Sequence, residues 1–393
     1  MSEHRLYRYR WVMVFLFWFL MFAYGSNWFA LSPMLTTFEK SFNIPAWQSH
    51  LLLSIIGLFV IFFAWPAGRL IDRRGAKLSA SIGALFMILG FGLRPWLLDS
   101  FQTLFLSSVI AGIGLAWILV ALAPQMMKWF PRGSASLPVG IASSGLFIGF
   151  GSGALSMPFL VEMISMRNAF LVFSIIAFIS FLLWVGLARE NPPTPPEERK
   201  DVKRVDFFEG LKEILSSSNA YIYPFIGFLI VGTTLSSSAF IHFIYPGEEG
   251  GIIGGSFLYG CAVGAFLAPF AARKYGLKKI SLLVAILSLV FWIGIYLVYI
   301  HNLWLLPIIL AFFFGFALQA SWPIALYCQE TEKGVNEANE GVASGLYISL
   351  SNIGAAILPV AFGYIEKDVP LCFSGISACI FILALLWTLV KRS

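Results

Sequence analysis

Twelve long apolar segments occupy most of this 393-residue chain. A helix that crosses a bilayer needs about 20 mostly apolar residues, because it rises about 1.5 Å per residue through about 30 Å of hydrocarbon. Strands of a membrane barrel would instead give shorter segments of alternating hydrophobicity. With 59% hydrophobic and 12% charged residues, the chain is predicted to be an all-α membrane protein with twelve transmembrane helices. The predicted spans are residues 10–35, 49–71, 78–98, 101–127, 134–160, 167–188, 219–245, 252–272, 279–300, 302–328, 340–364 and 370–390.

The second six predicted spans repeat residues of the first six at a constant distance of 201 positions. The matched pairs are Gly75 and Gly276, Lys77 and Lys278, Gly114 and Gly315, Gly140 and Gly341, Ala142 and Ala343, Ser143 and Ser344, Gly153 and Gly354, and Pro158 and Pro359. A repeat kept in register indicates a repeated structural unit. We therefore expect an N-terminal six-helix bundle at 1–188 and a C-terminal six-helix bundle at 219–393. The hydrophilic residues 189–218 include a proline cluster at 192–196 and are predicted to form a semi-rigid cytoplasmic linker.

The positive charges indicate which side of the membrane each loop faces. Lys and Arg in short loops are retained on the cytoplasmic side. All but four of the 26 Lys and Arg residues lie at the termini or in alternate loops, the exceptions being Lys40, Arg94, Arg167 and Lys367. We expect a multi-pass protein of the cytoplasmic membrane with both termini in the cytoplasm. The net charge of +6 reports this topology and not nucleic-acid binding, because the cations are spread over successive loops.

Enzymatic function has little support in the sequence. The histidines, His4, His50, His242 and His301, are dispersed, and neither a nucleophile elbow nor a phosphate-binding Gly-Lys-Ser/Thr segment occurs. The cysteines, Cys261, Cys328, Cys372 and Cys379, lack metal-site spacing. We expect no cofactor, no metal and no disulfide. The expected partners are the lipid bilayer and a small-molecule substrate, with the chain as a monomer. The first span is too long for a cleaved signal peptide and is expected to remain.

The loop after the second predicted span, from Gly68 to Lys77, reads GRLIDRRGAK. This resembles the signature of the major facilitator superfamily, in which an acid and basic residues lie between two glycines. The number of spans, the mid-chain linker and the repeat extend the resemblance over the full length. The resemblance implies two pseudo-symmetric six-helix bundles and secondary transport by alternating access, in which the two halves rock about one central site.

The resemblance also implies a conformational latch formed by Gly68, Asp72, Arg73 and Gly75. An acid is needed where the inner end of the second span meets the positive N-terminal end of the eleventh, and Asp72 is the candidate. The alternative is that Asp72 only neutralises the neighbouring arginines. The corresponding loop of the second half, residues 268–279, lacks the acid, so one latch is expected to be much weaker than the other.

Charges within a span are costly and persist mainly for function. No carboxylate lies near the middle of a predicted span, since Asp72 and Glu162 are close to span ends. A carboxylate-based proton relay is therefore disfavoured. Arg94 lies about 25 Å of helix beyond Lys77 and is expected to snorkel to the outer face. An anion-attracting role for Arg94 is the alternative.

Polar and aromatic residues are the remaining candidates for a central site. The candidate substrate-binding residues are Asn27, Trp28, Trp117, Ser143, Tyr259, Gln319, Trp322, Tyr347 and Asn352. For each aromatic residue taken alone, packing in lipid or in the core is the better explanation, because 17% of the chain is aromatic. Glycines of the fifth predicted span, Gly140, Gly145, Gly149, Gly151 and Gly153, are expected to face Gly341, Gly345 and Gly354 of the eleventh. They predict a close packing surface, or a smooth surface on which bundles rock or a substrate binds.

Two subfamily resemblances suggest different substrates. The glycine run from Gly145 to Gly153, with Ser351, Asn352 and Gly354, resembles nitrate, cyanate and organic-anion porters, although the arginines of nitrate porters are missing. The Asn27, Trp28 pair with Arg94 is similar to haem and choline carriers. The first favours an organic anion, and the second favours an amine, choline-like or porphyrin substrate in an aromatic-lined cavity. A non-transporting receptor or scaffold on the same fold is the competing class.

Overall fold

The computed structural model describes residues 7–131, 134–196, 207–245, 248–301, 306–336 and 339–391. Over these residues the chain is helical without any strand, and twelve helical segments are long and apolar enough to cross a membrane. The predicted all-α membrane fold is confirmed. The spans are α1 (Tyr9–Phe29), α3 (Ala46–Arg74), α4 (Ala76–Met87), α5 (Phe101–Trp129), α6 (Ser136–Ile164), α7 (Met166–Leu187), α9 (Asn219–Ile244), α10 (Glu248–Tyr275), α11 (Leu277–Ile300), α12 (Leu306–Ala320) with α13 (Trp322–Glu330), α14 (Glu340–Ile365) and α15 (Val369–Leu389).

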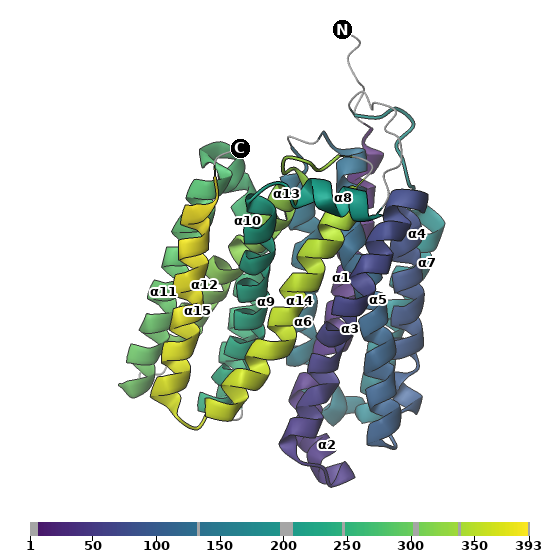
Figure 1. Ribbon diagram of the computed structural model, residues 1–393. Coiled ribbons are helices and arrows are strands. Elements are labelled where there is room, and N and C mark those ends of the chain that lie inside the picture. The colour runs from purple at the N-terminus through teal and green to yellow at the C-terminus, as the bar shows by residue number, and fades with distance from the viewer. Residues whose placement is uncertain are drawn as a thin grey trace.

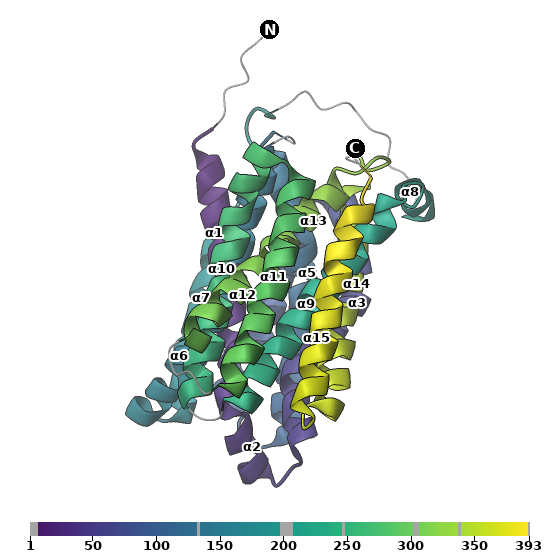
Figure 2. The same ribbon diagram turned by 90° about the vertical axis from the view of Figure 1, so that its left-hand side faces the viewer.

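The first and last spans place the two ends of the chain on one side of the bundle (Figure 1). We call this the terminal side. The short helix α8 (Phe207–Ile214) also lies there, whereas α2 (Leu35–Phe42) lies on the opposite side. In Figure 1 most of the helices before α8 lie on the right and most of those after it on the left. The quarter turn in Figure 2 shows that the spans run roughly along one common axis.

Two glycines from the sequence repeat have the same structural role. Gly75 separates α3 from α4 with φ of 96°, and Gly276 separates α10 from α11 with φ of 102°. This left-handed region is open to glycine, which has no Cβ, and is strained for other residues. The constant distance of 201 positions thus corresponds to the same kind of tight turn between two spans in each half.

Glycines let the backbones of α1 and α6 touch. A Cβ at Gly145, Gly149 or Gly153 would clash with the main chain of α1, at Trp18, Phe22 and Ser26 respectively. The expectation that these glycines face α14 is wrong. Helix α6 uses them against its own half, while Gly341 and Gly345 of α14 pack on α3 and Gly354 packs on α9. Close packing decides their place because helices in lipid associate by backbone approach.

Part of the predicted linker is helical. Helix α8 lies within residues 189–218 and buries Ile214 against Val342 and Ala343 at the start of α14. The Glu213 carboxylate accepts a hydrogen bond from Asn339 Nδ2 at 3.2 Å. The segment from 197 to 206 lies outside the described residues. The end of the linker is therefore packed on the second half and does not run free.

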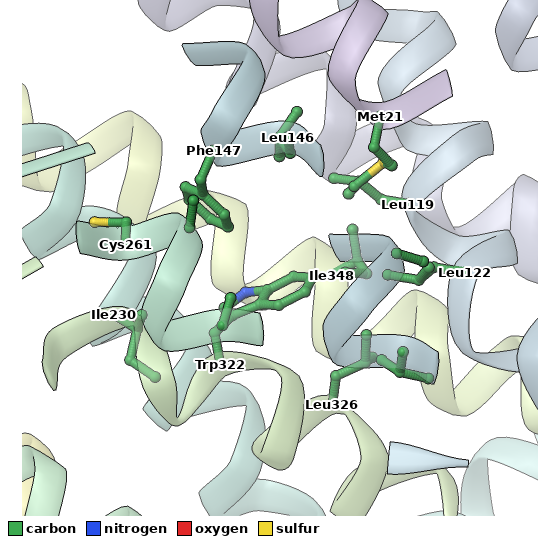
Figure 3. Packing of buried hydrophobic residues seen from close by; sticks show 14 of the residues in the cluster. Met21, Leu119, Leu122, Leu146, Phe147, Ile230, Cys261, Trp322, Leu326 and Ile348 are labelled. Atoms are coloured by element: carbon green, nitrogen blue, oxygen red, sulfur yellow. The ribbon is translucent and has the colours of Figure 1, made fainter. Parts of the chain in front are cut away.

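The centre of the molecule is filled by apolar side chains from both halves (Figure 3). Leu119 and Leu122 of α5 come from the first half, and Leu326 of α13 and Ile348 of α14 come from the second. Each of these four side chains is buried. The core therefore extends across the seam between the halves.

We expect Gly149→Ala to destabilise the protein, because the new methyl group would meet the backbone of Phe22. Overpacking costs about 1–3 kcal/mol, which exceeds the gain of about 1 kcal/mol in helix propensity. The matched control is Gly186→Ala on α7, where nothing lies within 4 Å of the added Cβ. Thermal unfolding in detergent should show a lower Tm for the first variant only. Equal Tm values for the two variants would contradict the proposed packing.

Candidate functional site

On the terminal side, Asp72 links the two halves. Its Oδ1 accepts a hydrogen bond from the backbone N–H of Gly341, at 2.8 Å, in the first turn of α14. Gly68, one turn earlier on α3, packs directly on the main chain of Gly341. Free N–H groups and the helix dipole make a helix N-terminus favourable for a carboxylate. Arg73 beside it is exposed. The contact that the latch hypothesis requires is thus present.

A second carboxylate, missed in the sequence, holds the other end of the same loop. Glu190 accepts hydrogen bonds from the backbone N–H groups of Ala76, at 3.0 Å, and Lys77, at 2.7 Å, just after Gly75. It also forms an ion pair with Lys128 at the end of α5. In the second half, Lys278 instead donates to the Thr388 carbonyl at 2.9 Å. The two loops are therefore held by different interactions, a carboxylate that accepts from backbone N–H groups in the first half and a lysine that donates to a carbonyl in the second.

The tenth span is interrupted near its middle, between α12 and α13. Pro323 lacks the N–H that would bond to the carbonyl of Gln319 four residues earlier, which explains the break. Gln319 is fully buried, and its Oε1 accepts a hydrogen bond from Thr234 of α9 at 3.2 Å. Trp322 follows the break, and its carbonyl accepts a hydrogen bond from Tyr347 of α14 at 3.2 Å. The structure therefore brings these three predicted residues together.

The position of Trp322 relates this group to the seam. Helix α13 contacts α5 and α6 of the other half, and Trp322 lies among Phe147, Ile348 and other residues of the central cluster (Figure 3). Its ring centroid is 6.0 Å from that of Tyr347. An aromatic pair with a neighbouring buried amide thus borders the interface between the halves.

Two further predicted residues lie on the seam. Tyr259 of α10 packs its ring against Gly151 of α6, and its hydroxyl is 3.4 Å from Ser152 Oγ. Asn352 of α14 lies opposite Gly57 of α3 and donates from Nδ2 to the Ile348 carbonyl at 2.9 Å. Both side chains therefore stand where a movement of one half against the other would change their surroundings.

The other predicted residues are engaged within the first half. Asn27 donates from Nδ2 to the Phe173 carbonyl at 2.9 Å, and Trp28 donates from Nε1 to the Leu53 carbonyl at 3.1 Å. Ser143 is buried and donates to the Gly140 carbonyl at 3.0 Å. Trp117 is half-buried and packs against the apolar core, about 200° around α5 from Leu119. The structure does not bring these residues together with Gln319.

The expectation that Arg94 snorkels to the surface is wrong. Arg94 is only 1% exposed and donates from Nη1 to the Asn27 carbonyl at 2.8 Å. Its other nitrogens lie 3.3 Å from the hydroxyls of Ser107 and Ser108, and the guanidinium stands 4.4 Å from the centre of the Phe91 ring. A π-helical turn at Ile88–Gly92 precedes it. That turn redirects the side chain into the bundle instead of towards lipid.

Buried carboxylates on the terminal side were also missed. Glu330 and Glu332 lie where the sequence predicted a loop, Glu340 is the first residue of the predicted eleventh span, and all three are buried. Glu332 accepts hydrogen bonds from Ser217 Oγ at 2.8 Å and from Asn219 Nδ2 at 3.1 Å. Helix α13 continues to Glu330, beyond the predicted end of the span at 328. Its last residue is therefore a carboxylate that lies inside the protein. The middle of each span remains free of acids.

Comparison with known proteins agrees with this architecture. The Major Facilitator Superfamily model matches residues 17–250, and a model described as MFS/sugar transport protein matches residues 139–366. The fucose:proton symporter FucP of E. coli has the same fold, with a TM-score of 0.75, 15% identity and coverage of 98% of this chain and 100% of that one.

The similar curated proteins include choline/ethanolamine transporters and anion transporters. The choline/ethanolamine transporter flvcr2b of Danio rerio is 24% identical over 414 residues, covering 97% of this chain and 83% of that protein. The probable anion transporter 4, chloroplastic, of Arabidopsis thaliana is 26% identical over 177 residues, covering 43% of this chain and 33% of that protein. With its twelve spans and these relatives, the chain is a membrane transporter that belongs to the Major Facilitator Superfamily.

Proposed function

We propose that this transporter moves a small organic amine of the choline or ethanolamine class by alternating access. The carrying observation is the group at the break of the tenth span, where Trp322 and Tyr347 adjoin the buried amide of Gln319. An aromatic face attracts a quaternary or primary ammonium by about 0.5–2 kcal/mol without a carboxylate. Two relatives that match over 97% of the chain carry the names of choline/ethanolamine transporters, which supports the same substrate class.

An organic anion is the second candidate. Arg94 is buried, and the hydrogen bonds described for it go to neutral oxygens. A cation within the first half would favour a nearby negative charge, since electrostatic interactions are strong away from water. The similarity to plant anion transporters extends over less than half of the chain. This candidate therefore rests on one residue and a partial match.

The orientation and location belong to the same proposal. The cations that cluster on the terminal side support a cytoplasmic position for both termini, and the protein is proposed to reside in the cytoplasmic membrane as a monomer. The first half and the second half, 1–188 and 219–393, are proposed to be the moving bodies. The hydrogen bond between Asp72 and Gly341 supports the proposal that these residues hold the terminal side closed.

Proteoliposomes that contain the purified protein should take up radiolabelled choline saturably, and ethanolamine should compete. Trp322→Ala should raise KM about tenfold by removing an aromatic contact, whereas Trp96→Ala, at a side chain 58% exposed beyond α4, should leave KM unchanged. Saturable uptake of carboxylates in place of choline, abolished in Arg94→Gln, would support the anion candidate. No saturable flux of either class would favour a scaffold.

Asp72→Asn should favour the state that is open on the terminal side. A hydrogen bond to a charged group contributes about 1.5–3 kcal/mol, so loss of the charge should shift the population about tenfold. The measurement is the rate of maleimide labelling of Cys328, which is buried near the terminal end of α13, with the other cysteines replaced by alanine. Labelling should accelerate several-fold.

The matched control for this latch experiment is Asp99→Asn. Asp99 has a side chain 81% exposed and pairs with Arg167 at 3.6 Å, so the same change should leave Cys328 labelling unaltered. An unchanged rate in both variants would remove the proposed latch role of Asp72.

A further inference from the structure

We infer that the break in the tenth span is a hydrogen-bonding subsite for a hydroxyl group of the substrate, with the side-chain amide of Gln319 as its central partner. This inference rests on the proposed transport of an amine and assigns one end of that substrate to a place in the fold. Gln319 lies near the middle of the span formed by α12 and α13. Interrupted helices near the bilayer midplane commonly form the binding sites of transporters.

The amide of Gln319 has an unused hydrogen-bonding group. Its Oε1 accepts from Thr234 Oγ1 at 3.2 Å, and this leaves Nε2 without a hydrogen-bond partner in the part of the chain that the structure describes. The residue is fully buried. An unpaired buried donor costs about 1–3 kcal/mol. A substrate oxygen that accepts from Nε2 would remove that cost.

Two buried serines lie close to Gln319 in the chain or to Thr234 on the facing helix. Ser321 is the residue at the break, and Ser237 lies one turn along α9 from Thr234. Both are buried, and neither Oγ has a hydrogen-bond partner among the described residues. A hydroxyl ligand can both donate and accept, so it suits this set of groups in either orientation of the amide.

The aromatic pair of Trp322 and Tyr347 indicates how the substrate would be oriented in the subsite. Trp322 follows Ser321 directly and lies in the central cluster (Figure 3). Its ring centroid is 6.0 Å from that of Tyr347. An ammonium group held by these rings would place its hydroxyl towards α9 and α12. The aromatic rings would therefore bind the ammonium end of a hydroxyalkyl amine, and the Gln319 amide would bind its hydroxyl end.

Only the second half carries this subsite. At the equivalent positions of the first half, 201 residues earlier, Gln319 corresponds to Ile118 and Ser321 corresponds to Val120. Both are apolar, and α5 is continuous there. A substrate that bound at the seam would thus have its hydroxyl directed to the second half in every transport cycle.

The test compares choline with ethyltrimethylammonium, which lacks only the hydroxyl, as competitors of labelled choline uptake into proteoliposomes. The wild-type protein should prefer choline about tenfold, as expected for one hydrogen bond in a buried site. Gln319→Leu should abolish the preference and leave inhibition by ethyltrimethylammonium unchanged. Thr234→Val, which releases the amide, should reduce the preference. Gln102→Leu, the same change at an exposed position of α5, should retain it.

Each failure has a distinct meaning. If the wild-type protein transports choline but binds both compounds equally, the hydroxyl subsite is overturned while amine transport stands. A tenfold preference that persists in a folded Gln319→Leu variant overturns the assignment to Gln319. If the wild-type protein transports neither amine, the proposed function fails and this inference fails with it. The wild-type comparison needs no variant, so a misfolded mutant leaves the test intact.

Discussion

Direct contact between helix backbones at glycines is the interaction on which the rest of this structure depends. Lipid is as apolar as a leucine side chain, so spans gain little by hiding apolar surface and associate by close packing. Helix α6 uses two glycine faces. Gly145 and Gly149 hold it to α1, whereas Gly140 and Gly151 face α10 across the seam. One helix thus combines a fixed contact within its half and a contact between halves.

The terminal side is organised by carboxylates in unequal ways. Asp72 reaches the N-terminus of α14, and Glu190 holds the start of α4 together with Lys128. The second half has a different brace, in which Asn219 bonds the main chain of Lys391 at 2.9 Å. Each half is therefore tied to itself by several hydrogen bonds, while Asp72 joins the two halves on this side. Ser349 of α14 also joins them, because it accepts a hydrogen bond from Trp65 Nε1 at 3.1 Å and donates to the Ile61 carbonyl at 2.9 Å.

The two halves also differ where a substrate would bind. The first half holds the guanidinium of Arg94 behind α1, bonded to neutral oxygens and stacked on Phe91. These contacts join Asn27 of α1 to α5 and to the segment that follows α4. The second half presents an interrupted helix with Gln319 and Trp322. Pseudo-symmetry of the fold thus coexists with an asymmetric distribution of polar groups.

The sequence alone determined the number of spans and the two-fold repeat, because hydrophobic length and residue spacing are local properties. The sequence also drew attention to Asp72 through the loop signature, and to Gly75 and Gly276 through their repeated spacing. Such patterns can be found without knowing how the helices pack. Only the tertiary structure decided that Arg94 is buried, because the groups that accept its hydrogen bonds, the Asn27 carbonyl and the Ser107 and Ser108 hydroxyls, come from other helices. It also decided which candidates meet: Gln319, Trp322 and Tyr347 converge, whereas Asn27 and Trp28 bond within the first half. Pro323 was a visible signal for the break, but which residues surround a break depends on how distant helices pack, and spacing along one helix cannot encode that.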